Sequence, residues 1–173
     1  MKITDAIALI EPGFRSKAAS ETWADLGSGS GTFTKALAAI LGSGGKIYAV
    51  DKQHQIFKQV AGVAFIEFYK LDFVNDPFPF FGLDGILMAN ALHFVNDKRT
   101  FIEKLKQHLQ PAGRVLIVEY DTEKANPWIP HPISFDKLAD TFPTFGFSRI
   151  EKIGERDSIF RREKMYACMV ETR

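Results

Sequence analysis

The chain has 173 residues, a net charge of +1, and 46% hydrophobic and 25% charged residues. This length is that of one domain, residues 1–173, which can bury a sufficient core without disulfide or metal support. The composition is that of a globular protein rather than a disordered or membrane-embedded one. Because proteins built to hold nucleic acid carry a strong basic excess, we expect no nucleic-acid partner.

The amino-terminal sequence MKITDAIALIEPG lacks the long apolar core of a secretory signal, because Asp5 interrupts it. No apolar run approaches the length of a membrane span, so we expect a cytoplasmic protein without a membrane partner. The single cysteine, Cys168, excludes an internal disulfide and a multi-cysteine metal site, and no metal is expected. Its apolar neighbours predict a buried thiol in a strand.

The amino-terminal third begins with apolar residues at helical spacing. They predict a helix over 3–10, which Pro12 and Gly13 end. After it we expect, in chain order, a strand, a glycine-rich loop, a helix and a strand, at residues 22–26, 26–31, 33–41 and 46–50. The second of these strands ends at Asp51.

The middle of the chain continues this alternation of helices and strands. We expect a weaker helix, a strand, a loop rich in Pro and Phe, and a strand, at residues 53–60, 63–69, 76–82 and 83–89. Asp97 then caps a helix that reaches Leu109. Pro111 and Gly113 end this helix before a strand over 114–120.

The last third contains a proline-rich loop over 121–132, a helix over 135–142 and two strands, over 147–153 and 164–170. No helix separates these two strands, so they should form an antiparallel hairpin at one edge. The alternation elsewhere predicts a parallel sheet covered on both faces. The expected fold is therefore α/β and doubly wound, with a mostly parallel seven-stranded sheet and an antiparallel last strand.

The strongest local signal is the segment DLGSGSG, residues 25–31, between a predicted strand and a helix. Glycine allows a sharp turn and close approach of a ligand, and the free N–H groups of a helix start favour a carboxylate or phosphate. In an open parallel sheet, ligands bind beyond the carboxyl ends of the strands. A structural turn can be equally rich in glycine, so the loop alone decides nothing.

Two carboxylates in register with this loop make the signal more specific. Asp51, 20 residues after Gly31, ends the second strand, where it can accept both hydroxyl protons of a ribose. Asp72 follows the third strand, where it can accept a hydrogen bond from an adenine amino group, with Phe73 against the ring. Each aspartate taken alone is equally well explained as a cap or turn residue. Together they predict a nucleoside site.

The sequence resembles class I S-adenosylmethionine-dependent methyltransferases, in the group of the ubiquinone and menaquinone methyltransferases. The resemblance covers roughly residues 20–120, and its motifs are the loop DLGSGSG, Asp51, Asp72, DGILMANALHFV (84–95) and LQPAGRVLIVE (109–119). It implies S-adenosylmethionine (SAM) as the cofactor. It also implies that the chain is an enzyme, which methylates an unidentified small-molecule acceptor.

The resemblance assigns a role to individual residues. The methionine moiety of SAM would be held by Asp25 and by the backbone of Gly27, Ser28, Gly29 and Gly31. The ribose would be held by Asp51, with Lys52 adjacent, and the adenine by Asp72 and the backbone of Phe73. Asn90, after the fourth strand, would lie near the methionine moiety and the transferred methyl group.

Two other functions use a similar loop. A nicotinamide-dependent oxidoreductase would need Gly or Ala where Thr32 stands, and more chain for its substrate. A SAM-binding regulator without turnover would keep the same loop and carboxylates. The phosphate-binding loop of nucleotide hydrolases is absent, because Ile47 follows Lys46.

Several residues outside the loop are candidates for the acceptor side. His93 is the best candidate for a general base, and is otherwise a histidine bonded to a nearby carbonyl. Tyr120 and Asp121 either orient an acceptor or simply end a strand. Four cations of the last hairpin could attract an anionic acceptor, or belong to a solvated turn: Arg156, Arg161, Arg162 and Lys164. The protein is expected to be a monomer or homodimer.

Overall fold

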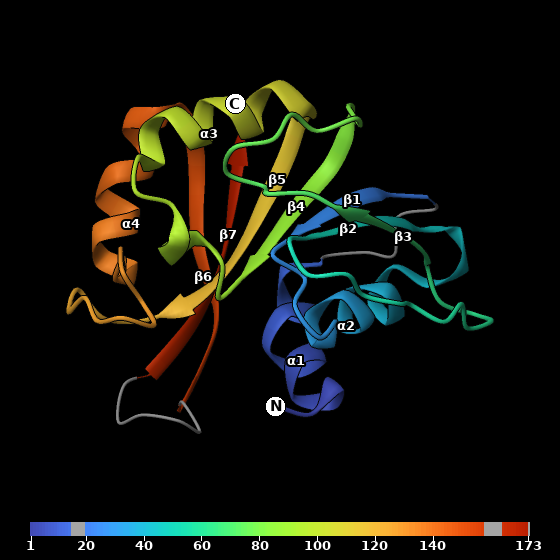
Figure 1. The fold of residues 1–173 in the computed structure, drawn as a ribbon. Coiled ribbons are helices and arrows are strands. Elements are labelled where there is room, and N and C mark those ends of the chain that lie inside the picture. The colour runs from blue at the N-terminus through green and yellow to red at the C-terminus, as the bar shows by residue number, and fades with distance from the viewer. Residues whose placement is uncertain (15–19, 158–163, 173) are drawn as a thin grey trace.

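The computed structural model describes residues 1–14, 20–157 and 164–172. These residues form a seven-stranded sheet in the order β3-β2-β1-β4-β5-β7-β6 (Figure 1). The strands are β1 (Thr22–Leu26), β2 (Lys46–Asp51), β3 (Phe65–Lys70), β4 (Leu83–Ala89), β5 (Leu109–Tyr120), β6 (Phe147–Asp157) and β7 (Lys164–Thr172). The first five pair in parallel, and β7 is antiparallel to both β5 and β6. The predicted fold class is confirmed.

Helices cover both faces of the sheet (Figure 1). They are α1 (Ile3–Ile10), α2 (Thr32–Leu41), α3 (Lys98–His108) and α4 (Phe135–Thr141), with short 3₁₀ helices η1 (Glu11–Gly13), η2 (Gly42–Gly44), η3 (Leu92–Phe94) and η4 (Phe142–Phe145). On one face α1 and α2 pack against the sheet, and on the other α3 and α4 do so. No helix in the described ranges is long and apolar enough to cross a membrane.

The central strands are apolar on both sides because both faces of the sheet are covered. In β5, Val115 and Ile117 belong to the core under α3 and α4, whereas Leu116 and Val118 belong to the core under α1 and α2. Cys168 of β7 is fully buried, as predicted, and burial raises the pKa of its thiol. Because β1, β2, β4 and β5 run parallel, their carboxyl ends meet at one edge of the sheet, where the loops that follow them lie.

The predicted helix over 53–60 is wrong, because this segment has no regular secondary structure. The Gln59 side chain instead bonds the main chain of Ile66, with Nε2 donating to the carbonyl oxygen at 2.6 Å and Oε1 accepting from the N–H at 3.3 Å. The ring of Phe57 occupies the space beside Gly31, where a Cβ would lie 2.4 Å from it. These contacts with other parts of the chain outweigh a weak helical pattern.

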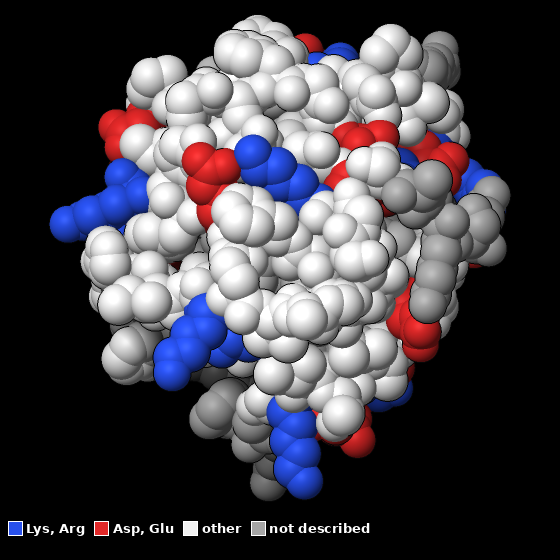
Figure 2. All heavy atoms as spheres, turned by 90° about the vertical axis from the view of Figure 1, so that its right-hand side faces the viewer, with Lys and Arg blue, Asp and Glu red and all other residues white. Residues whose placement is uncertain are grey.

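The strand β3 is one edge of the sheet, and the side of the molecule on which it lies carries few charges at its centre (Figure 2). Phe65, at the start of this strand, is 51% exposed. Unpaired edge strands tend to pair with other chains. Because Gln59 bonds both main-chain groups of Ile66, it covers part of this edge.

Candidate active site

The glycine-rich loop turns sharply between β1 and α2. Gly27, Gly29 and Gly31 have positive φ angles of 81°, 51° and 82°, which residues with a side chain rarely adopt. A Cβ on Gly27 would lie 2.7 Å from the Cβ of Ala91. Gly31 is the residue immediately before the first turn of α2. The loop therefore requires glycine both for its turns and for its packing against the segment after β4.

Asp25, in β1, is a buried carboxylate with one unused oxygen. Its Oδ2 accepts a hydrogen bond from Thr34 Oγ1 at 2.6 Å, whereas its Oδ1 has no hydrogen-bond partner in the described part of the chain. Burial raises the pKa of Asp25 to about 7; the Thr34 bond opposes this rise and the Asp51 carboxylate adds to it. A cationic donor would stabilise the ionised form of this group.

Asp51 lies at the end of β2, beside the glycine loop. Its Oδ2 accepts from the N–H of Gly29, and its Oδ1 accepts from the N–H of Gln53, both at 2.8 Å. Each oxygen of an ionised carboxylate has two lone pairs, so each can accept another hydrogen bond. The two backbone bonds thus fix the carboxylate while leaving it able to bind a pair of hydroxyl groups.

Asp72 organises the turn that follows β3. Its Oδ2 contacts Lys52 Nζ at 2.9 Å and Asn75 Nδ2 at 2.7 Å, and its Oδ1 accepts from the Val74 N–H at 3.0 Å. Burial alone would raise the pKa of Asp72, but these bonds outweigh it and lower the pKa to about 2. The carboxylate thereby holds Phe73 in place, and its predicted contact with an adenine stays a prediction.

Asn90, directly after β4, has a left-handed backbone conformation, which is uncommon outside glycine but which asparagine adopts more readily than most residues. Its φ angle is 54°, and its N–H donates to the Val118 carbonyl oxygen at 2.8 Å. Its side-chain Oδ1 is buried and has no hydrogen-bond partner in the described ranges. Residues in such strained conformations cluster at functional sites.

In the described part of the chain, three buried polar atoms at this end of the sheet have no hydrogen-bond partner: Asp25 Oδ1, Ser28 Oγ and Asn90 Oδ1. Buried polar atoms are nearly always hydrogen-bonded, so such a group calls for an explanation. Two of the three are oxygen acceptors of a carboxylate and an amide. A ligand that carries several N–H donors, such as an ammonium group, would satisfy them.

These residues line one end of a cavity of about 800 Å³, a size that suits a small-molecule site. The predicted site residues that line it are Asp25, Gly27, Ser28, Gly29, Asp51, Lys52, Phe73 and Asn90. Gly31, Asp72 and His93 do not form part of the described wall. The structure thus brings most of the predicted cofactor residues to one cavity.

A second part of the cavity wall is built from distant parts of the chain. It consists of Met1, Phe33, Phe94, Tyr120, Arg156 and Met165, and we call it the acceptor end. Tyr120 was a candidate by its position at a strand end, and Arg156 as one of the cations of the last hairpin. The apolar members carry no local signal in the sequence, because their convergence depends on the order of the strands.

His93 lies behind this apolar wall. Its Nδ1 is 2.8 Å from Glu119 Oε2, and its backbone N–H donates to Glu119 Oε1 at 3.1 Å. Both residues are buried, and the His93 ring packs against the ring of Phe94 at 4.3 Å between centroids. His93 is therefore bonded to a carboxylate, not to the carbonyl that the sequence suggested. Its candidate role as a general base stays a prediction.

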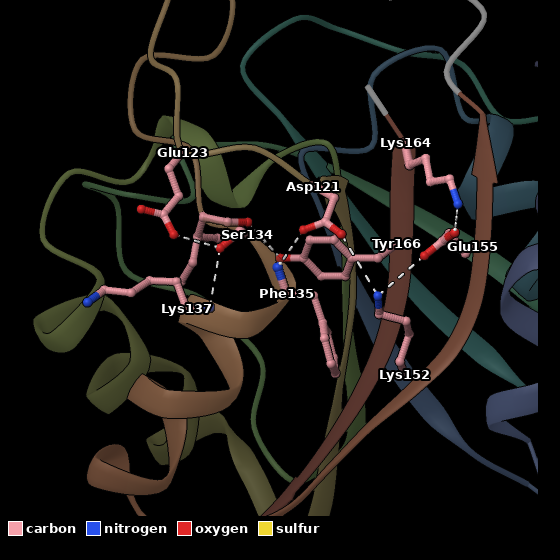
Figure 3. Close-up of polar contacts among 10 residues, drawn as sticks. Asp121, Glu123, Ser134, Phe135, Lys137, Lys152, Glu155, Lys164 and Tyr166 are labelled. Carbon is pink, nitrogen blue, oxygen red and sulfur yellow. Dashed lines mark hydrogen bonds and ion pairs between the residues drawn. The ribbon is translucent and has the colours of Figure 1, made fainter. Parts of the chain in front are cut away.

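Ion pairs brace the strand ends beside the cavity (Figure 3). Lys152 Nζ lies 3.8 Å from Asp121 Oδ2 and 3.4 Å from Glu155 Oε2, and Lys164 also pairs with Glu155. Asp121 Oδ1 accepts from the Phe135 N–H at 2.9 Å. Asp121 thus ties the start of α4 to the hairpin. Arg161 and Arg162 lie outside the described residues.

Comparison with known proteins agrees with this geometry. The profile of a family described as "methyltransferase domain" matches residues 24–117, which is more than half of the chain. The chain belongs to this family. A demethylmenaquinone methyltransferase of Clavibacter sepedonicus is 32% identical over 108 residues, covering 60% of this chain and 43% of that protein. The ubiquinone/menaquinone biosynthesis C-methyltransferase UbiE of Cronobacter sakazakii is 24% identical over 138 residues, covering 76% and 51%.

The fold recurs in solved structures. The YcgJ protein from Bacillus subtilis has a TM-score of 0.73 at 16% identity, covering 98% of this chain and 99% of that one. Human N-acetylserotonin methyltransferase in complex with SAM has a TM-score of 0.68 at 19% identity, covering 97% and 51%. The chain spans about half the length of the two methyltransferases found by sequence.

The cavity residues of this methyltransferase domain fit S-adenosylmethionine, the cofactor expected from the sequence. The unpartnered oxygens of Asp25 and Asn90 suit the ammonium group of the methionine moiety, and Asp51 suits a ribose. When bound, SAM supplies a methyl group already activated by the positive charge on sulfur. A protein that uses this cofactor has to bind it, to orient the acceptor and to exclude water.

Proposed function

We propose that the protein transfers the methyl group of SAM to a small organic acceptor with an apolar, ring-containing body. The observation that carries this proposal is the continuity of the cavity, which runs from the glycine loop to a wall of Met1, Phe33, Phe94, Tyr120 and Met165. An apolar wall next to a polar cofactor site favours an acceptor that leaves water on binding. A small acceptor fits the volume of this cavity better than a macromolecule does.

Residue roles follow from the contacts around the cavity. In this proposal Asp25, Asn90 and the loop of Gly27, Ser28 and Gly29 hold the methionine moiety. Asp51 binds the ribose, with Lys52 and Phe73 beside the nucleoside. Gly31 acts by shaping the start of α2, and Asp72 by shaping the turn that presents Phe73.

The acceptor class follows in part from the relatives. One is named for demethylmenaquinone and the other for C-methylation in ubiquinone and menaquinone biosynthesis. We therefore place reduced quinones and related phenols first among the acceptors, with a ring carbon as the methylated atom. Phe94 and Tyr120 offer the aromatic contacts that such rings prefer.

An activity screen tests this proposal. The protein is incubated with SAM and a panel of hydroquinones, phenols and aliphatic amines, and release of S-adenosylhomocysteine (SAH) is measured. We expect release with ring acceptors, none without an acceptor, and loss of release in Asp51→Ala. If the protein binds SAM but methylates none of the ring acceptors, the proposal is overturned and the alternative of a SAM-binding regulator without turnover is favoured. Light scattering would separate monomer from homodimer, which stays a prediction, as does the cytoplasmic location.

A further inference from the structure

We propose that Arg156 binds an anionic group of the methyl acceptor, and that Asp5 is the carboxylate which this group replaces. The inference rests on the proposed function, because it concerns the acceptor end of the same cavity. It narrows the substrate class to apolar ring compounds that carry one carboxylate, phenolate or similar oxyanion.

Arg156 is placed at the cavity by the β6–β7 hairpin. It is the register partner of Met165, and directly opposed residues of antiparallel strands project from the same face of the sheet. Both residues line the cavity. A cation is therefore set beside an apolar wall, the arrangement that suits an acceptor with an apolar body and a charged substituent.

The guanidinium of Arg156 has unused hydrogen-bonding capacity. In the described ranges its ionic partner is Asp5, with 3.5 Å between Nη1 and Oδ2. Strong charge-assisted hydrogen bonds are shorter, at about 2.7–2.9 Å, and a guanidinium offers five N–H donors in a planar fork. A planar oxyanion can engage two of these donors at once, so it can compete with the long contact to Asp5.

The other described cations near this site are also paired with carboxylates, but none of them lies beside Met165 in the cavity wall. Lys52, which lines the cofactor end, contacts Asp72 at 2.9 Å. Lys152 and Lys164 belong to the ion pairs with Asp121 and Glu155 (Figure 3), and neither lysine is part of the described cavity wall. Among the described residues, Arg156 is thus the cation of the cavity wall that an anion meets next to Met165.

The carboxylate of Asp157 also lines the cavity and limits the charge that the acceptor can carry. Asp157 is the register partner of Lys164, which offsets its charge only in part. A polyanion would be repelled by this carboxylate and by Asp51. A single anionic group is the better match.

Asp5 is held near Arg156 by the packing of α1 on β6. A Cβ on Gly154 would lie 2.7 Å from the Leu9 carbonyl oxygen, so the absence of a side chain there lets the helix approach the strand. Asp5 Oδ2 also accepts the N–H of Lys2 at 3.2 Å. When an anion replaces Asp5 at Arg156, the Asp5 carboxylate still accepts the hydrogen bond from the Lys2 N–H. The exchange therefore leaves no buried charge without a partner.

The test compares two probes that share a shape and differ in charge, 2-naphthoate and 2-naphthamide. Calorimetry measures the Kd of each with wild type, Arg156→Gln, Arg156→Lys and Asp5→Asn, with and without saturating SAH. Arg149→Gln is the control, because Arg149 lies on the same strand, pairs with Glu151 and does not line the cavity. The Kd for SAH is measured for every variant.

We expect Arg156→Gln to raise the Kd for 2-naphthoate by about tenfold and to leave the Kd for 2-naphthamide unchanged. The reason is that hydrogen bonds between charged groups are stronger than those to a neutral amide. Arg156→Lys should fall between wild type and Gln. Asp5→Asn removes the carboxylate that competes for Arg156, so it should lower the Kd for 2-naphthoate. The change should be only about threefold, because the Asp5 side chain is partly exposed. Arg149→Gln should match wild type.

Absent or equal binding of the two probes to the wild-type protein, or an unchanged Kd for 2-naphthoate in Arg156→Gln, overturns the inference. A failure of SAH to bind any variant instead contradicts the cofactor assignment, and the titrations without SAH still report on Arg156. The two failures are therefore distinguishable.

Discussion

Thr34 donates a 2.6 Å hydrogen bond to one oxygen of the buried Asp25 carboxylate, and the other oxygen of this carboxylate has no described partner. Because the folded-state pKa of about 7 exceeds the ordinary value of 3.8, folding favours the protonated form. The stability that Asp25 contributes is present below about pH 4 and is lost as the pH rises through about 7. We expect Asp25→Asn to abolish this loss, measured by urea unfolding across that range without cofactor. An unchanged pH dependence in the variant would contradict the assignment.

Cofactor binding should release a proton from Asp25. An ammonium group beside this carboxylate lowers its pKa, so at about pH 6 the bound state favours the ionised form. Calorimetry of SAH binding in two buffers of different ionisation enthalpy should show release of up to about one proton per site in the wild-type protein. We expect the heat to be independent of the buffer in Asp25→Asn. Equal proton release by both proteins would rule out Asp25 as the source.

The close approach of Gly27 to Ala91 predicts a specific cost of adding one methyl group. Gly27→Ala combines a strained φ of 81° with a contact of 2.7 Å, and we expect it to lose about 3 kcal/mol of unfolding free energy and most SAM binding. Gly62→Ala is the matched control, because Gly62 has a φ of 84° and a Cβ added there would meet no described atom within 4 Å beyond its chain neighbours. It should lose about 1 kcal/mol and bind SAM normally. Similar binding by both variants would contradict the role of Gly27.

Lys52 and Asp72 form an ion pair, but only Asp72 also holds the turn after β3, so substitutions of the two residues should differ in effect. Lys52 is largely exposed, so we expect Lys52→Gln to change the Kd for SAH by no more than about threefold. Asp72→Ala also removes the hydrogen bonds that Val74 and Asn75 donate, and should raise the Kd for SAH by at least about tenfold. Titration of both variants checks this order. Equal losses would show that the ion pair, rather than the turn, sustains the site.

The pairing of His93 with Glu119 predicts a supporting role for the histidine. Glu119→Ala leaves the buried His93 N–H without an acceptor and should cost about 3 kcal/mol of unfolding free energy, whereas Glu119→Gln should cost less. With an acceptor in hand, we expect His93→Gln to lower kcat by less than about tenfold and to leave the pH–rate profile unchanged. A larger drop, with loss of an ionisation near neutrality, would identify His93 as the general base.

Much of the fold could be predicted because its signals are local. Strand ends, the loop DLGSGSG and Asp51 lie within about 30 residues of one another, and the strand–helix alternation fixes their common edge. Parallel strands buried on both faces leave continuous apolar runs, which is why β4 was placed at its observed bounds and the apolar part of β5 was found. The predicted start of β5 at residue 114 was wrong, because the strand begins at Leu109 and runs through Pro111 and Gly113, where a break was expected. The helix over 53–60 failed because Gln59 and Phe57 bond and pack outside their own segment.

The acceptor end could not be predicted in the same way. Met1, Phe33, Phe94 and Met165 converge only once α1 rests on the sheet and β7 inserts between β5 and β6. That Asn90 Oδ1 is buried without a hydrogen-bond partner in the described ranges likewise depends on the residues packed around it. Contacts between elements far apart in the chain decide these positions, and one sequence carries no local trace of them.

The cofactor assignment is tested most directly by calorimetric titration of the wild-type protein and Asp51→Ala with SAM, SAH and NAD. We expect micromolar binding of SAM and SAH, no binding of NAD, and loss of at least about tenfold in affinity for SAM and SAH in Asp51→Ala, since this variant removes the carboxylate that binds the ribose. Folded wild-type protein that binds NAD, or that binds neither SAM nor SAH, would contradict the assignment.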